Sequence, residues 1–248
     1  MAESKTKRRW TREETLAALS LYTQTPFGKM GPNNSDVQEL AKRFDRTTSS
    51  IALKLANFAS LDPEHQERGM SGMSHVSKLD QEVWRDFYGK WDQLAEVGIP
   101  IESREDTTEI GFVETESLAT VRIRRGQQFF RQTVLSAYAN RCCITGISSS
   151  NLIRASHIIP WATQTHTRLD PQNGLALNAL HDAAFDKGLI AFDDACQLLL
   201  SDHLRDCIPE SVFAIFFAQY EGKRIKMPDR FAPRIEYLRH HRDRVFSG

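Results

Sequence analysis

The sequence predicts an α+β protein, with a helical N-terminal part and a second part built around two short strands and a helix. Three observations support this prediction. Apolar residues recur at helical spacing through residues 1–97, an acidic segment interrupts the pattern at 98–118, and short apolar stretches then alternate with turns. We therefore expect a helical domain over 1–97, a linker over 98–118, and a second domain with C-terminal helices over 119–248.

The first helix is expected to begin at Thr11. Thr11 and Glu14 have the spacing of a capping box, in which each side chain accepts a hydrogen bond from the backbone N–H of the other. Further helices are predicted over 35–44, from Thr47 or Thr48 to Leu61, and over 78–94. The helix over 78–94 carries a core stripe made of Val83, Phe87, Trp91 and Leu94.

The three short helices open with Trp10, and the third begins with the hydroxyl-rich stretch at 47–50. They resemble the Myb/SANT and helix-turn-helix modules that bind DNA. This resemblance implies that the third helix enters the major groove and that Lys54 approaches the nucleic acid. A helical bundle with solvated polar faces is the alternative, because the segment as a whole is not basic.

Overall charge does not indicate a partner. Lys and Arg together number 32, as do Asp and Glu, so any basic surface must arise locally. The chain has no apolar stretch long enough to span a bilayer, and its first residues, MAESKTKRRW, are not followed by an apolar signal core. We expect a cytoplasmic protein with no membrane partner.

Positive charge is concentrated at the start of the second domain. A predicted helix there carries Arg124 and Arg125, and Arg154 follows shortly before the motif described next. Such a surface is suited to DNA phosphates, since each neutralised phosphate releases counterions. A solvated helix face is the alternative. Further along, a strand pair is predicted over 189–202, a helix over about 209–220, and a last helix in the basic tail.

The residues best suited to catalysis lie in the run from Arg154 to Gly188. In IRASHII a short apolar strand ends at His157, just before Pro160. A histidine here suits a general base, because its ordinary pKa lies near neutrality. Asn173, followed by Gly174, marks a turn, and its amide can donate to and accept from backbone groups so as to brace the strand that carries His157.

His181 stands at the start of the helix LHDAAFDKG, from which a side chain can point back toward the strands. We interpret His181 as a metal ligand. Asp186, five residues later, has three open interpretations: a second metal ligand, a partner that orients an imidazole, or a contact at the helix C-terminus.

The ordered residues His157, Asn173 and His181, with the ending LHDAAFDKG, resemble the HNH endonucleases, which have a ββα-metal fold. The resemblance covers roughly residues 128–200. It implies that His157 is the general base, Asn173 the central asparagine of the motif, and His181 the final metal-binding histidine. A divalent ion is implied as cofactor, with Mg²⁺ or Mn²⁺ preferred and Zn²⁺ or Ni²⁺ as alternatives.

The chain departs from that pattern at two points. Ser156 precedes His157 where many members carry Asp or His, and the paired CxxC zinc sites of many members are missing. The remaining ligand can then be the Ser156 hydroxyl, Asp186, or water and substrate phosphate, a mixed shell that Mg²⁺ accepts.

These residues predict a metal-dependent DNA endonuclease with a one-metal mechanism, acting in restriction or defence. A homodimer is expected if both strands of a duplex are cut, and a monomer if one strand is nicked. A DNA-binding regulator with an inactive nuclease fold is the first alternative. A protein-interaction module of a defence or toxin system is the second.

Overall fold

The computed structural model describes residues 8–67, 76–97 and 118–248. The chain divides into two compact units, one made of Met1–Thr23 and Gly28–Glu116, the other of Gln24–Phe27 and Ser117–Gly248. Helices combine with two small antiparallel sheets, which confirms the α+β class. Residues 98–117 of the predicted linker lie outside the described part of the chain. Within that part, no helix has the length and apolar character needed to cross a membrane.

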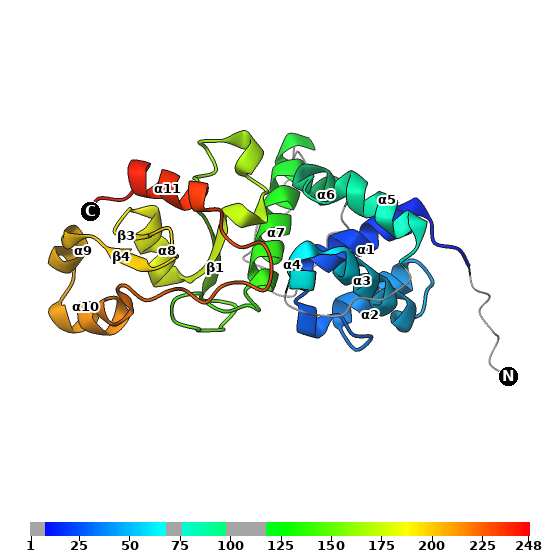
Figure 1. Cartoon of the computed structure of the whole chain (residues 1–248), viewed down its shortest axis with the longest axis horizontal. Helices are drawn as coiled ribbons and strands as arrows, with labels where there is room; N and C mark the ends of the chain where they lie inside the picture. Colours follow the sequence, from blue (N-terminus) through cyan, green and yellow to red (C-terminus); the bar gives the residue numbers. More distant parts are fainter. Residues whose placement is uncertain (1–7, 68–75, 98–117) are drawn as a thin grey trace. The chain divides into compact units, whose positions relative to one another are not determined.

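The first unit is helical (Figure 1). Its elements are α1 (Arg12–Gln24), η1 (Phe27–Lys29), α2 (Ser35–Arg43), α3 (Thr48–Leu61), α4 (Pro63–Glu67), α5 (Lys78–Phe87) and α6 (Trp91–Val97). The capping box is confirmed, since Thr11 N donates to Glu14 Oε2 at 2.9 Å and Glu14 N donates to Thr11 Oγ1 at 3.2 Å. Thr47 caps α3 by accepting from Ser50 N. Local capping chemistry therefore sets these helix starts.

The single helix predicted over 78–94 is wrong. The structure ends α5 at Phe87 and begins α6 at Trp91. Gly89 lies between them with a φ of 85°, in the left-handed region that favours glycine and ends a helix. The apolar spacing continues across the break, because Val83 and Leu94 are both buried.

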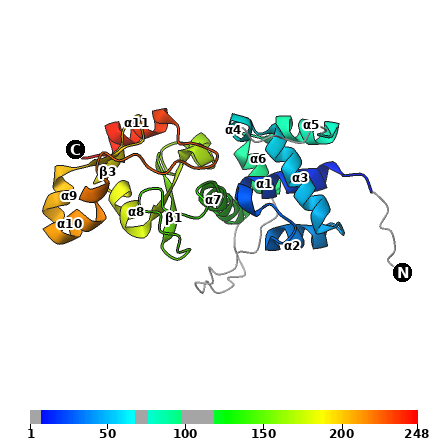
Figure 2. The same ribbon diagram turned by 60° about the horizontal axis from the view of Figure 1, so that its bottom comes forward.

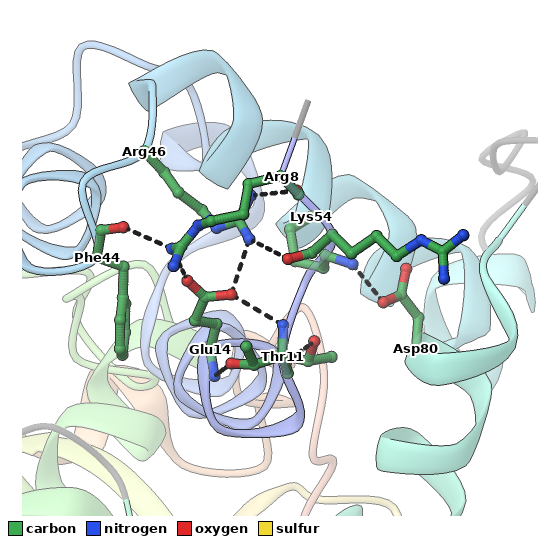
Figure 3. A network of polar contacts seen from close by, with 9 residues as sticks. Arg8, Thr11, Glu14, Phe44, Arg46, Lys54 and Asp80 are labelled. Atoms are coloured by element: carbon green, nitrogen blue, oxygen red, sulfur yellow. Dashed lines mark hydrogen bonds and ion pairs between the residues drawn. The ribbon is translucent and has the colours of Figure 1, made fainter. Parts of the chain in front are cut away.

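The interior of the first unit holds a charged network around Glu14 (Figure 3). Glu14 pairs with Arg8 and with Arg46, the latter at 2.7 Å. Lys54 donates to Asp80 Oδ1 at 2.5 Å, and its Nζ lies 4.3 Å from the centre of the Trp10 ring. Lys54 is only 4% exposed. Its assignment to the DNA-binding surface is thus corrected: α3 turns this side chain inward, where it neutralises a buried carboxylate.

The second unit begins with the long helix α7 (Leu118–Ala137), which is followed by a hairpin of β1 (Ile153–His157) and β2 (Gly174–Asn178). The strands are antiparallel, with His157 opposite Gly174 at one end and Ile153 opposite Asn178 at the other. Helix α8 (Ala179–Asp186) starts directly after β2 and packs on both strands. Figures 1 and 2 both show β1 between α7 and α8, so each face of the hairpin is covered by a helix.

Smaller elements complete the second unit. Its further elements are η2 (Thr165–Thr167), η3 (Pro171–Asn173), β3 (Ile190–Phe192), β4 (Leu198–Leu200), α9 (Asp202–Cys207), α10 (Glu210–Phe216), η4 (Ala218–Tyr220) and α11 (Ile235–Arg244). The predicted strand pair is confirmed, with Ile190 opposite Leu200. The helix predicted over 209–220 divides into α10 and η4 at Phe217.

His241 of α11 gives the fold a built-in sensitivity to acid. Its ring stacks on Phe185 with centroids 3.7 Å apart, and its Nε2 lies 3.0 Å from the Phe185 carbonyl oxygen. Burial lowers the pKa of His241 to about 4, because a charged imidazolium would lose its hydration. The folded protein therefore holds this imidazole neutral at a pH where the unfolded chain protonates it.

We expect the free energy of unfolding to fall as the pH drops from 6.5, the ordinary value for histidine, toward 4. Above 6.5 the stabilisation is fully present. Between pH 7 and 4.5 the wild type should lose about 2–3 kcal/mol more than His241→Gln. Denaturant titrations of both proteins at the two pH values check this, and equal losses would show that His241 is not responsible.

Candidate active site

His157 lies at the end of β1, between two aromatic rings. It stacks on Phe130 of α7 with centroids 3.8 Å apart and an interplanar angle of 9°. Trp161 meets it edge-on at 5.4 Å. Because successive side chains of a strand point to opposite faces, His157 faces α7, whereas Ser156 faces the α8 side of the hairpin.

The hydrogen bond of His157 decides which ring nitrogen can act as a base. Nε2 lies 2.9 Å from the carbonyl oxygen of Arg168, which can only accept, so Nε2 carries the proton. The lone pair therefore resides on Nδ1. Burial lowers the pKa of His157, an effect that the bond to Arg168 opposes. The imidazole is thus neutral near pH 7, the state that a general base requires.

Asn173 holds together the loop that joins β1 to β2. It is fully buried, and its Oδ1 accepts from Ile159 N at 2.8 Å. Its Nδ2 donates to the carbonyl oxygens of Ile159 and Thr167, each at 3.1 Å. These bonds join the residues just after His157 to the η2 turn beside Arg168, whose carbonyl orients the imidazole. Asn173 is therefore a brace in geometry, and these hydrogen bonds of its amide go to Ile159 and Thr167, not to His157.

Gly174 allows α7 to approach the hairpin closely. A Cβ at this position would overlap Val134 Cγ2 and lie 3.0 Å from Phe130 Cζ. Gly174→Ala must therefore displace the ring on which His157 stacks. We expect it to lower the free energy of unfolding by about 1–3 kcal/mol and, if the site around His157 acts as a nuclease, to reduce cleavage by protein that remains folded.

Denaturant unfolding and plasmid cleavage test this expectation. Gly31→Ala is a matched control, because a Cβ there meets no atom within 4 Å. If Gly174→Ala and Gly31→Ala behave alike in both measurements, close packing of α7 at Gly174 is not needed.

His181 lies at the opposite end of the hairpin from His157. It follows Asn178, which pairs with Ile153, four strand positions or about 13 Å from the His157 pair along β1. The side chain is fully buried. Its ring packs edge-on against Phe217 at 5.0 Å. The register therefore places Asn173 beside the His157 end of the hairpin, whereas α8, which carries His181, begins at the other end.

Both ring nitrogens of His181 have protein partners. Asn178 Oδ1 accepts from the backbone N–H groups of Leu180 and His181, so its Nδ2 must be the donor toward His181 Nδ1, 2.7 Å away. His181 Nε2 then donates to the Phe216 carbonyl oxygen at 2.8 Å. Burial lowers the pKa of His181. In this arrangement His181 joins α8 to α10, and its interpretation as a metal ligand stays a prediction.

The Asn178 amide extends this contact to the turn after α7. Its Nδ2 also lies 3.4 Å from Thr145 Oγ1 and 3.7 Å from Cys142 Sγ. Cys142, Thr145, Asn178 and His181 form what we call the polar knot. Its members are two pairs spaced three residues apart, the spacing of paired zinc ligands, but here hydrogen bonds join them.

Two carboxylates on α8 are better suited to a divalent cation. Asp182 and Asp186 are four residues apart and thus neighbours on one side of the helix. Burial, with the nearby charge of Asp182, raises the pKa of Asp186. In the described part of the chain neither carboxylate has an ion pair within 4.0 Å. Sequence reasoning missed Asp182, although its spacing from Asp186 was visible.

The carboxylates of Asp182 and Asp186 supply oxygen donors of the kind that a hard cation prefers, but not a complete set of ligands. The described residues contain no group of three or more His, Cys, Asp or Glu side chains placed to hold a metal ion. Mg²⁺ requires fewer, because it binds through one or two carboxylates and keeps several waters. The buried Ser156 hydroxyl, on the α8 side of the hairpin, also has no hydrogen-bond partner among the described residues.

The arginines predicted to contact DNA lie at separate positions. Arg124 and Arg125 are exposed on α7. Arg154 is exposed on β1, where its Nη1 donates to the carbonyl oxygens of Asn151 and Ile153 at 3.1 and 3.4 Å. A different arginine, Arg168, is in contact with His157 through its carbonyl oxygen.

Comparison with protein families agrees with this geometry. Residues 142–193 match the family model described as HNH endonuclease. This segment is an HNH domain. It contains the hairpin, the loop braced by Asn173, and α8. The HNH match indicates a nuclease of that family. A search of curated proteins finds no match to the chain.

Proposed function

We propose that the HNH domain hydrolyses phosphodiester bonds in DNA with a divalent metal ion. The observation that carries the proposal is the state of His157: Nε2 is committed to the Arg168 carbonyl, Nδ1 holds the lone pair, and the ring is neutral. A neutral imidazole fixed in one tautomer can accept a proton from an attacking water.

Each residue then has a stated task. His157 Nδ1 accepts the proton of the water as its oxygen attacks phosphorus, and the 3′ or 5′ oxygen leaves. Asn173 keeps the loop and thus the Arg168 carbonyl in place. Asp182 and Asp186 would hold the ion, which when bound supplies stabilisation of negative charge on the phosphate and on the leaving oxygen. Mg²⁺ or Mn²⁺ matches these oxygen donors best.

Relaxation of supercoiled plasmid tests the proposal. We expect nicking with Mg²⁺ or Mn²⁺, none with EDTA, and strongly reduced nicking from His157→Ala with either metal. Binding without nicking in every metal would favour a DNA-binding regulator with an inactive nuclease fold. Neither cutting nor salt-sensitive binding would favour a protein-interaction module.

The same assay addresses the finer parts of the proposal. A role in restriction or defence predicts different cleavage of methylated and unmethylated plasmid. A homodimer predicts double-strand breaks that appear without a nicked precursor, together with a dimer mass in solution. Accumulation of nicked circles from a monomeric protein would instead support single-strand cleavage.

A further inference from the structure

The loop between β1 and β2 holds an arginine beside the base. Arg168 Nε donates to the Trp161 carbonyl oxygen at 2.8 Å, and its guanidinium carbon lies 5.3 Å from the centre of the Trp161 ring. The same indole meets His157 edge-on. The Trp161 ring therefore contacts both the guanidinium and the imidazole.

The backbone and side chain of Arg168 serve different purposes. Its carbonyl oxygen fixes the tautomer of His157 at 2.9 Å. Its side chain is half-buried and held by Trp161 at Nε alone. Among the described residues neither Nη1 nor Nη2 of Arg168 has a hydrogen-bond or ion-pair partner, which leaves four N–H donors of the planar fork for an external acceptor.

We propose that Arg168 is a phosphate-binding residue of this site. Its Nη1 and Nη2 donate to non-bridging oxygens of the DNA backbone beside His157, and Trp161 fixes the orientation of the fork. A guanidinium matches two phosphate oxygens at once, which an ammonium does not. The inference deepens the proposed nuclease function and rests on it.

The contrast with Arg154 supports this choice. Arg154 directs its Nη1 back to carbonyl oxygens at the start of its own strand. It pairs with Leu177, toward the end of the hairpin that lies away from His157. Arg168 instead lies in the loop that also supplies the acceptor for the base. Arg168 thus binds phosphate through its side chain and orients the general base through its backbone carbonyl.

A purely structural role is the competing account, in which Arg168 only fastens the loop to Trp161. The variants Arg168→Ala, Arg168→Gln and Arg168→Lys separate the two accounts, because all retain the backbone carbonyl that orients His157. Arg141→Ala is the matched control. Arg141 is an exposed arginine that also donates to a backbone carbonyl, that of Gly146 at 3.5 Å, and it precedes Cys142 of the polar knot.

DNA binding is measured first, in EDTA and on a His157→Ala background, so that the result does not require cleavage. We expect removal of the Arg168 charge by Ala or Gln to weaken binding about 10-fold and to reduce the slope of log Kd against log salt by about one. Arg168→Lys should retain the slope. Arg141→Ala should match the Arg168-intact parent in affinity and slope.

Cleavage is measured second, in the otherwise wild-type protein. We expect Arg168→Ala and Arg168→Gln to lower kcat/KM about 10- to 100-fold, and Arg168→Lys to restore it only in part because the planar fork is lost. If Arg168→Gln keeps the salt slope and the cleavage of Arg141→Ala, the proposal is overturned. A wild type that never cuts contradicts the nuclease function alone, since the salt slopes still report on Arg168.

Discussion

His157→Ala is expected to lower plasmid cleavage by about 100- to 10,000-fold, the usual contribution of a general base. The reason is geometric: Nε2 is committed to the Arg168 carbonyl, so Nδ1 is the ring atom that can take a proton. DNA affinity should stay within a few-fold of wild type, because the substitution removes no charge from a neutral imidazole.

His166→Ala is the matched control for this variant. His166 belongs to the same loop and is exposed. We expect it to cut at the wild-type rate. Thermal melting of both variants shows whether loss of the stack on Phe130 also loosens the fold. Cleavage by folded His157→Ala equal to that of His166→Ala would remove His157 from the chemistry.

The second large effect is expected at the carboxylate pair. Asp182→Asn combined with Asp186→Asn should reduce cleavage by at least about 100-fold in every divalent metal, because both proposed oxygen ligands lose their charge. The fold should not weaken, since the substitutions relieve repulsion between two like charges. Plasmid cleavage and thermal melting measure the two effects, and calorimetric titration shows whether Mn²⁺ affinity falls together with cleavage.

His181→Ala should show the reverse pattern. Its loss leaves the Phe216 carbonyl and the Asn178 amide without their ring partner in a buried place. We expect the free energy of unfolding to fall by about 2–4 kcal/mol, while Mn²⁺ affinity of the folded protein is retained. If Mn²⁺ binding disappears with His181→Ala and persists in the double Asn variant, the ligand assignment must return to His181.

Features decided by neighbouring residues could be predicted from the sequence. The start of α1 follows from Thr11 and Glu14, which cap each other within one turn. The HNH segment followed from the order and context of His157, Asn173 and His181. The break at Gly89 was missed, because a single glycine inside an apolar helical pattern does not by itself end a helix.

Features decided by distant partners could not be predicted. Lys54 looks like an exposed helical lysine until Asp80, 26 residues away, is brought beside it. His181 has the sequence context of a ligand, yet its Nε2 partner lies 35 residues downstream at Phe216. Only the tertiary structure shows which polar side chains already use their hydrogen-bond donors and acceptors within the fold.

In a hairpin held by zinc, a bound ion would be required for the fold as well as for the reaction. The polar knot separates these two requirements. Hydrogen bonds of Asn178 and His181 join the strand end to α10 and to the turn at Thr145, so protein groups alone connect these segments. Under the proposed function, we therefore expect the ion to be needed for the reaction and not for the fold of this region. We expect such a protein to stay folded and inactive in chelator and to begin cleavage when the ion is added, so that its turnover can be timed from that addition.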